Sequence, residues 1–264
     1  MSRPDDQNIS TEPHIESLWR YPVKGLMGEE LQNVEVEEQS CFPYDRKYAI
    51  ENGPSPFDPK APKFLPKINF LMLMRNERLS LLTTKFEEET ETLTILRQDR
   101  PVASGDLRSA IGRNMIEQFI AAFMSEELKG PPRIQSAPNH HFTDTDARYV
   151  HIINRASVTA LGHMVNGALN PKRFRANIVL AGLEPWAEKQ WVGKKLQAGP
   201  VEIEIKEETN RCAAINVDPE TAKRDQSLPA ILNQQFGNDN FGIYGEIKQG
   251  GTLEKGARFT VKSS

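Results

Sequence analysis

The sequence predicts an α+β fold, with a mostly β N-terminal part, a linking helix, and a second β-rich part that carries further helices. Many short segments have strand-type composition, and residues 201–205 alternate apolar and glutamate side chains, as a strand with one buried face does. Apolar residues recur at helical spacing within 104–124 and after 157, and Pro229 in the first turn with Gly237 just past the end indicates a short helix at 227–236. Such a mixture of strands and separate helices is typical of α+β proteins.

In the N-terminal part, the composition predicts strands at 15–21, 31–37, 44–50, 67–73, 78–84 and 90–96. The helix expected over 104–124 would be capped by Ser104 or Asp106. Five prolines between residues 52 and 66 exclude a helix or a central strand there. This long loop is expected to be a lid, a binding loop or merely a mobile segment.

In the second part, strands are expected at 149–153, 178–180, 201–205, 241–247 and 257–261. The polar, irregular stretch 126–146 is the best candidate for a domain junction. We therefore divide the chain into a disordered tail at 1–13, an N-terminal β domain with its linking helix at 14–130, and a second domain at 131–264.

Composition and charge limit the partners, the cellular location and the cysteine chemistry that are expected. The 264 residues carry a net charge of −3 with scattered Lys and Arg, which gives no basic footprint for nucleic acid. The N-terminus lacks the pattern of a signal or transit peptide, and no apolar run is long enough to span a membrane, so a cytoplasmic location is expected. The two cysteines, Cys41 and Cys212, are expected to be free thiols.

Cys212 is the residue that most needs an explanation. On its own, a free cysteine is most often a small buried hydrophobe. The adjacent Arg211 would favour the thiolate if the two side chains lie close together, and a thiolate ligates metal or attacks electrophiles.

Several cations and polar residues elsewhere could meet an anion. Lys24 and Gly25 lie in a loop with two glycines, Arg46 falls in an expected strand, and Arg175 shares one face of an extended segment with Asn177. For Lys24 a solvated turn explains the same pattern, and for Arg46 an internal salt bridge does.

A strand running into a helix is predicted around Asn154, Arg155 and Ser157. The N–H groups at such a helix start favour phosphate, and these side chains would match it. Ordinary capping by Asn154 or Ser157 explains the same residues equally well, so both interpretations stay open.

Taken together, five motifs resemble the MOSC proteins, and in particular the two-part group that includes the mitochondrial amidoxime-reducing component and its bacterial relatives. The resemblance runs in order from about residue 15 to 261. The motifs are Tyr21-Pro22-Val23-Lys24-Gly25, Asp45-Arg46, Phe174-Arg175-Ala176-Asn177-Ile178-Val179, the stretch from Arg211-Cys212 through Asp218-Pro219-Glu220-Thr221, and Phe241-Gly242.

The resemblance implies an N-terminal MOSC-type β domain followed by a MOSC β-barrel, with a molybdenum cofactor (molybdopterin) between them. Cys212 would be the metal ligand, and Asp218 would lie near the metal as a second catalytic residue. The cofactor and its phosphate would be held by Lys24, Gly25, Arg46, Asn154, Arg155, Ser157, Arg175 and Asn177. Binding of pyridoxal phosphate is left open.

Three positions depart from the pattern of that group. Gly25 replaces its usual serine, Ala222 stands where a glycine commonly follows the Asp-Pro-x-Thr motif, and Ala257 stands where the closing Gly-Asp is expected. The sequence also lacks a C-terminal ferredoxin domain with its four cysteines. Electrons would therefore come from a separate flavin or iron–sulfur protein.

The function implied by the resemblance is a molybdenum-dependent oxidoreductase that reduces small N-hydroxylated substrates such as amidoximes, hydroxylamines or N-hydroxylated bases. A sulfur carrier or transferase that uses a Cys212 persulfide is one alternative. A barrel that binds a phosphorylated ligand or a protein partner without turnover is another, which the departures at residues 25, 222 and 257 keep open.

Overall fold

The computed structural model describes residues 12–263, so residues 1–11 of the expected tail lie outside the described residues. The strands are β1 His14–Arg20, β2 Glu29–Leu31, β3 Asn33–Val36, β4 Ala49–Asn52, β5 Thr83–Glu87, β6 Thr92–Arg97, β7 Arg100–Asp106, β8 Pro132–Gln135, β9 Val150–Asn154, β10 Ile178–Ala181, β11 Lys195–Ala198, β12 Val201–Asn210, β13 Asn240–Gln249, β14 Gly251–Glu254 and β15 Phe259–Lys262. The α-helices are α1 Ala110–Phe123, α2 Arg155–Met164 and α3 Leu228–Phe236, and short 3-10 turns cover Lys67–Asn69, Glu77–Leu81, Pro171–Phe174, Ala187–Trp191 and Ala213–Asn216.

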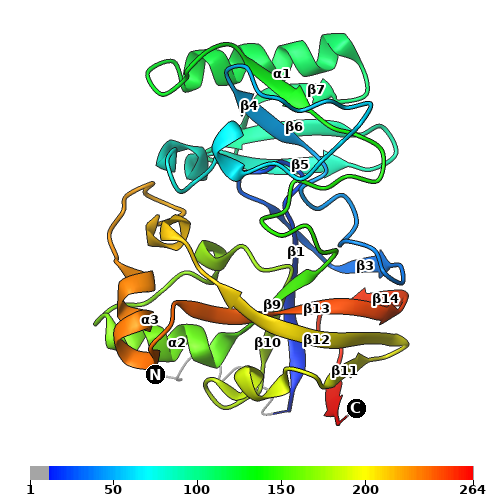
Figure 1. The fold of residues 1–264 in the computed structure, drawn as a ribbon, viewed down its shortest axis with the longest axis vertical. Coiled ribbons are helices and arrows are strands. Elements are labelled where there is room, and N and C mark those ends of the chain that lie inside the picture. The colour runs from blue at the N-terminus through cyan, green and yellow to red at the C-terminus, as the bar shows by residue number, and fades with distance from the viewer. Residues whose placement is uncertain (1–11, 264) are drawn as a thin grey trace, which may run out of the picture.

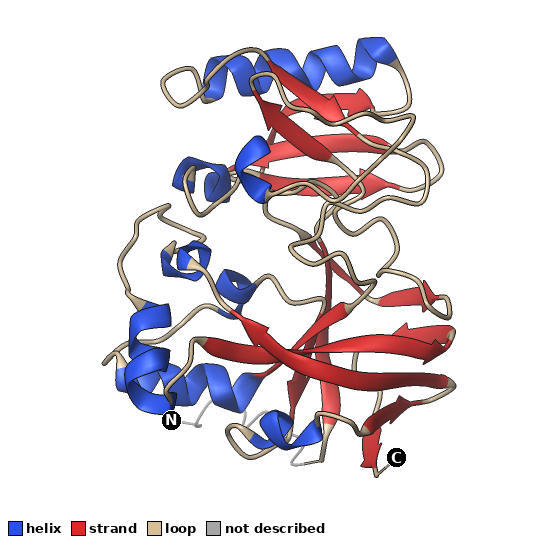
Figure 2. Cartoon of the chain, viewed as in Figure 1, coloured by secondary structure: helices blue, strands red, loops and turns tan. Residues whose placement is uncertain are grey.

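An eight-stranded sheet forms the larger of two lobes, with strand order β15-β11-β12-β13-β9-β10-β1-β2 (Figure 1). Its strands pair antiparallel except for β9 and β10, which are parallel. Helices α2 and α3 lie beside this sheet (Figure 2). The α+β class is confirmed, and among residues 12–263 the hydrogen-bonded ladder has two ends rather than closing into a barrel.

The smaller lobe contains the three-stranded sheet β5-β6-β7, the pair β4-β8 and helix α1 (Figure 1). Its core is a cluster of buried residues that runs from Val23 to Ile134, with Ile116 and Ile120 of α1 fully buried. A second large cluster joins Ile15 and Leu18 of β1 to the later strands of the larger sheet. The first strand therefore belongs to the core of the larger lobe.

Three predicted strands are wrong. Residues 44–46 form a turn, so Arg46 lies outside a strand and β4 begins only at Ala49. Residues 67–73 begin with a 3-10 turn, and residues 78–81 lie in another. Helix α1 begins later than expected, at Ala110, because residues 100–106 continue the small sheet as β7. The cap is Ser109, whose side chain accepts a hydrogen bond from the Gly112 N–H, and not Ser104 or Asp106.

The proline-rich loop packs against the segment that joins the lobes. Phe57 lies 5.0 Å from Phe142 and 6.4 Å from Phe70 between ring centroids, in a small separate cluster of buried residues. Offset or edge-on aromatic pairs of this kind stabilise local packing. The loop is thus fastened at Phe57, and its C-terminal end leads into Lys67.

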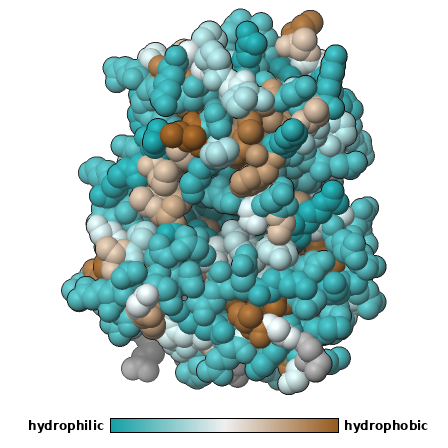
Figure 3. Space-filling model, viewed as in Figure 1, coloured by the Kyte–Doolittle hydropathy of each residue, from teal (hydrophilic) through white to brown (hydrophobic). Residues whose placement is uncertain are grey.

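The visible face of the molecule is mostly hydrophilic, with small scattered apolar patches (Figure 3). None of the helices in the described part of the chain is long and apolar enough to cross a membrane.

Candidate functional site

A cavity of about 370 Å³ lies where the two lobes meet, and segments from both contribute to its wall. Six cations and four acids line it, so positive charge is in excess. The cations are Lys24, Lys67, Arg46, Arg173, Arg175 and Arg211, and the acids are Asp45, Asp144, Glu207 and Glu208. Cys212 also lines this cavity.

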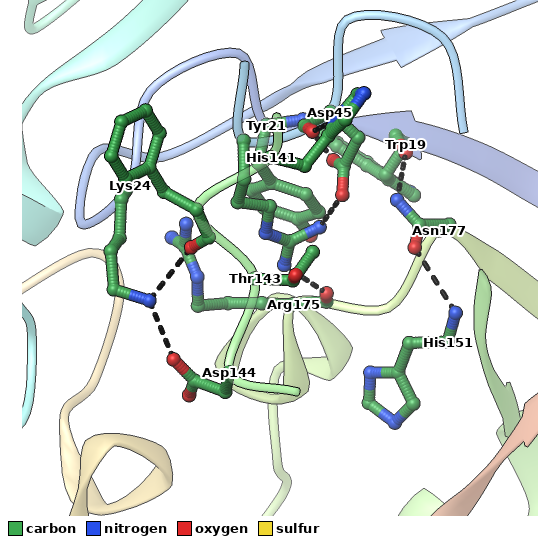
Figure 4. Close-up of polar contacts among 12 residues, drawn as sticks. Trp19, Tyr21, Lys24, Asp45, His141, Thr143, Asp144, His151, Arg175 and Asn177 are labelled. Atoms are coloured by element: carbon green, nitrogen blue, oxygen red, sulfur yellow. Dashed lines mark hydrogen bonds and ion pairs between the residues drawn. The ribbon is translucent and has the colours of Figure 1, made fainter. Parts of the chain in front are cut away.

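Lys24 reaches the cavity from the loop after β1. Its backbone N–H bonds Tyr48 O, which fixes the loop against the smaller lobe. The buried ammonium lies 2.8 Å from Phe142 O and 2.6 Å from the Asp144 carboxylate (Figure 4). Burial lowers the pKa of Lys24, although Asp144 opposes this effect.

Gly25 has a backbone that only glycine adopts easily. Its φ is +89°, and a Cβ here would lie 2.9 Å from Leu71 O and 3.1 Å from a methyl carbon of Leu79. A serine at this position would therefore be strained. Among residues 12–263 the Gly25 N–H has no hydrogen-bond acceptor, so a backbone donor is present at this position.

Arg46 and Arg175 share one aromatic platform. Each guanidinium carbon lies 4.5 Å from the centroid of the Tyr21 ring. Arg46 donates to Arg175 O at 2.9 Å and pairs with Asp45, while Arg175 donates to Leu26 O at 2.6 Å. Burial, followed by the charge of Arg46, lowers the pKa of Arg175 to about 10.

Both arginines have positive φ, +49° for Arg46 and +53° for Arg175. Non-glycine residues rarely adopt this conformation, and such strained positions cluster at functional sites. The chain thus accepts a backbone cost at two places in order to bring two cations to one wall.

Asn177 uses its side chain to join strands. It donates to Trp19 O at 3.3 Å and accepts from the His151 N–H at 3.1 Å (Figure 4). The residue lines the cavity, but its amide oxygen and nitrogen each already have a protein partner.

Cys212 follows the end of β12 and is half-buried. Lys67, from the end of the proline-rich loop, lies beside its thiol. Burial lowers the pKa of Lys67, but Asp144 and Cys212 outweigh it, and the pKa is raised overall. Sequence reasoning missed Lys67 because it placed this residue in a strand.

Arg211 enters the same cavity from beside Cys212. It donates to Phe174 O at 2.7 Å, and a second nitrogen lies 3.3 Å from Nε2 of His151. Burial, together with the charges of Arg211 and Arg46, lowers the pKa of His151 well below its ordinary value, so the imidazole is neutral. The Nε of Arg211 is buried without a hydrogen-bond partner in the described chain.

Asp218 lies outside the residues that line the cavity. One carboxylate oxygen accepts from the N–H groups of Glu220 and Thr221, and the other accepts from Arg173 at 2.8 Å. Buried Arg173 also pairs with Asp225. Asp218 was expected near a metal, but its side chain instead makes contacts that shape the loop after Cys212.

Asn154, Arg155 and Ser157 are also separated from the cavity. Asn154 caps α2 through the Ala156 N–H, which is the capping alternative, and both Asn154 and Ser157 donate to the fully buried carboxylate of Glu188. Arg155 lies 3.8 Å from Glu16. An internal carboxylate therefore takes the donors that were expected to meet a phosphate.

A cofactor with a phosphate and a thiolate-ligated metal fits the residues of the cavity. Lys24, Arg46 and Arg175 could hold the phosphate, since charged hydrogen bonds to phosphate are strong. The unpartnered N–H of Gly25 adds a neutral donor, and Cys212 supplies a soft ligand.

The backbone strain in the turn formed by Asp218 and the residues after it can be tested by substituting Ala222. Its φ is +56°, which an alanine adopts at a cost of roughly 1 kcal/mol. We expect Ala222→Gly to raise the free energy of unfolding by about 0.5–1 kcal/mol, measured by denaturant titration. The control Ala230→Gly, at an exposed position in the first turn of α3, should instead lower it by up to about 1 kcal/mol. A loss of stability in Ala222→Gly would contradict this explanation of the turn.

The raised pKa of the buried Glu188 carboxyl predicts that the stability of the protein depends on pH. Burial raises its pKa, although Ser157 and Asn154 oppose this. The folded state therefore holds the proton more tightly, and the free energy of unfolding falls as the pH rises from about 4.3 toward the raised pKa. Glu188→Gln should remove this fall, so its stability relative to wild type should be greater at pH 8 than at pH 4. Equal differences at both pH values, or the same change in the exposed control Glu184→Gln, would refute it.

Comparisons with known proteins match two domain models to this chain. Residues 12–136 match the MOSC N-terminal beta barrel domain, and residues 137–260 match the MOSC domain. Among solved structures, the YUAD protein from Bacillus subtilis is similar at 10% identity and a TM-score of 0.48, over 96% of this chain and 97% of that chain, which is too weak to argue from.

Two kinds of curated relative match most of the chain. Molybdenum cofactor sulfurase of Caenorhabditis elegans is 25% identical over 251 residues, 92% of this chain and 35% of the relative. Mitochondrial amidoxime-reducing component 1 of Homo sapiens is 22% identical over 253 residues, 81% of this chain and 69% of the relative. The chain spans about a third of the length of the sulfurases that it matches. By its two matched domains, the chain belongs to the family of proteins in which a MOSC N-terminal beta barrel domain precedes a MOSC domain.

Proposed function

We propose that this protein is a molybdenum-cofactor-binding oxidoreductase that reduces N-hydroxylated substrates with electrons from a separate flavin or iron–sulfur protein. The observation that carries the proposal is that one cavity gathers Cys212 with Lys24, Arg46 and Arg175. The thiol and these cations come from distant parts of the chain, and internal ion pairing leaves the cavity with excess positive charge. The similarity to an amidoxime-reducing component supports the choice of reaction.

Each residue has a distinct role in this proposal. Cys212 ligates the metal, while Lys24, Arg46 and Arg175 bind the phosphate, with the buried Tyr21 ring packed against both guanidinium groups. Lys67 places a positive charge beside the Cys212 thiol. When bound, the cofactor would supply two-electron chemistry at the N–O bond, and the protein would position it.

A sulfur carrier or transferase is the second candidate, because several matched relatives are named molybdenum cofactor sulfurase. Lys67 and Arg211 next to Cys212 would also favour a persulfide anion. The two candidates differ in what the purified protein holds: metal and pterin in the first, and cyanide-labile sulfur in the second.

The test is to measure molybdenum and pterin in protein purified from a host that makes the cofactor. We expect near-stoichiometric molybdenum and pterin in the wild type, and loss of most of the molybdenum in Cys212→Ser because the thiolate ligand is gone. The matched control Cys41→Ala removes the other thiol, which is buried outside the cavity lining, and should keep the metal.

Reduction of benzamidoxime by an artificial electron donor should follow the molybdenum content. Wild-type protein without molybdenum or pterin would overturn the proposal. Cyanide-labile sulfur that disappears in Cys212→Ser would then favour the sulfur carrier.

A further inference from the structure

The Asp144 carboxylate lies between two lysines in the wall of the cavity. One oxygen is 2.6 Å from Lys24 Nζ, and the other is 3.5 Å from Lys67 Nζ. The two lysines come from different segments, the loop after β1 and the end of the proline-rich loop. A phosphate group could bridge two ammonium groups in the same way as this carboxylate does.

The wall behind Asp144 is positive as well. The charges of Lys24, Lys67 and Arg46 outweigh the effect of burial, so the pKa of Asp144 is lowered. Arg175 also interacts with the charge of Asp144. Asp144 is therefore an anion under ordinary conditions. Its side chain is about half exposed, at 49%, so it meets solvent on one side and the cations on the other.

The segment that carries Asp144 is anchored in the fold at its two ends. Before it, Phe142 is buried among aromatic rings and donates its N–H to Arg46 O at 2.7 Å. After it, Val150 begins β9 in the middle of the larger sheet.

Between these anchors, hydrogen bonds within the described chain join the segment to itself. Thr143 donates to Thr145 O, Ala147 donates to the Thr145 hydroxyl, and Tyr149 donates to Ala147 O. The ion pairs of Asp144 with Lys24 and Lys67 are thus the polar attachment of residues 143–149 to the opposite wall, and Figure 4 shows the one with Lys24.

We propose that Asp144 occupies the place between Lys24 and Lys67 that an incoming phosphate group takes, so that phosphate binding displaces Asp144 and releases residues 143–149. The inference rests on the proposed function only in taking the cavity to be a phosphate site. It requires neither metal nor turnover. The internal carboxylate would keep two lysines paired while the site is without ligand, and would weaken the binding of any anion that cannot replace both contacts.

Calorimetry with inorganic pyrophosphate tests the competition, using full-length protein from a host that lacks the cofactor. Asp144→Asn removes the competing charge and should bind pyrophosphate about 5- to 10-fold more tightly than wild type at low salt. The matched control Asp146→Asn removes one negative charge from the same segment, where residue 146 has no ion pair in the described chain, and should change affinity less than 2-fold. Adding Lys24→Met to Asp144→Asn should abolish the gain.

Hydrogen–deuterium exchange gives the second readout. Pyrophosphate should increase exchange in residues 143–149 of the wild type, and Asp144→Asn should already show the increase without ligand. A ligand that binds beside Asp144 without displacing it would instead protect these amides.

Equal affinities of Asp144→Asn and Asp146→Asn, or protection of residues 143–149, would overturn the inference. Neither result would bear on the molybdenum and pterin measurement that tests the proposed function. Conversely, protein without molybdenum whose Asp144→Asn variant still gains affinity would support the inference while the proposed function fails.

Discussion

Mutual repulsion among buried cations is the constraint on which the rest of this site depends. Arg46 and Arg175 stack on the same tyrosine ring, and Lys24 and Arg211 line the same cavity. Desolvation and like charge both oppose this arrangement. It persists because backbone carbonyls, Asp45 and Asp144 accept hydrogen bonds from these cations, and because the two lobes hold the segments rigidly from opposite sides.

Much of the site could be predicted from sequence because its residues lie in short motifs. Lys24, Gly25, Arg46, Arg175, Asn177 and Cys212 do line one cavity in the structure. Their roles toward a cofactor stay predictions. Asn154, Ser157 and Asp218 were assigned to the site by the family resemblance, but Glu188 and Arg173 are the groups that they bind. Such partners come from distant elements and leave no local pattern.

In the fold too, elements determined by local sequence patterns could be predicted, and elements determined by distant contacts could not. The period-two pattern of β12 and the Pro and Gly residues around α3 indicated these elements correctly. Residues 67–73 and 78–81 have strand-type composition, but 67–69 and 78–81 lie in 3-10 turns, because tertiary packing around the small sheet overrides a weak propensity. Lys67 and Asp144 were missed for a related reason: the first lies in a misassigned strand, and the second in a polar stretch without periodicity.

The place of β1 in the larger sheet has a consequence for how the chain is made. Leu18 pairs with Ile178, so β1 is synthesised well before its long-range partner strand in the second half of the sequence. Until that partner is synthesised, β1 exposes apolar side chains and unpaired backbone groups. Contacts between such distant residues slow folding, and unpaired strand edges favour aggregation. The smaller lobe, whose strands β5, β6 and β7 are consecutive, can form first and shelter the loop that follows β1.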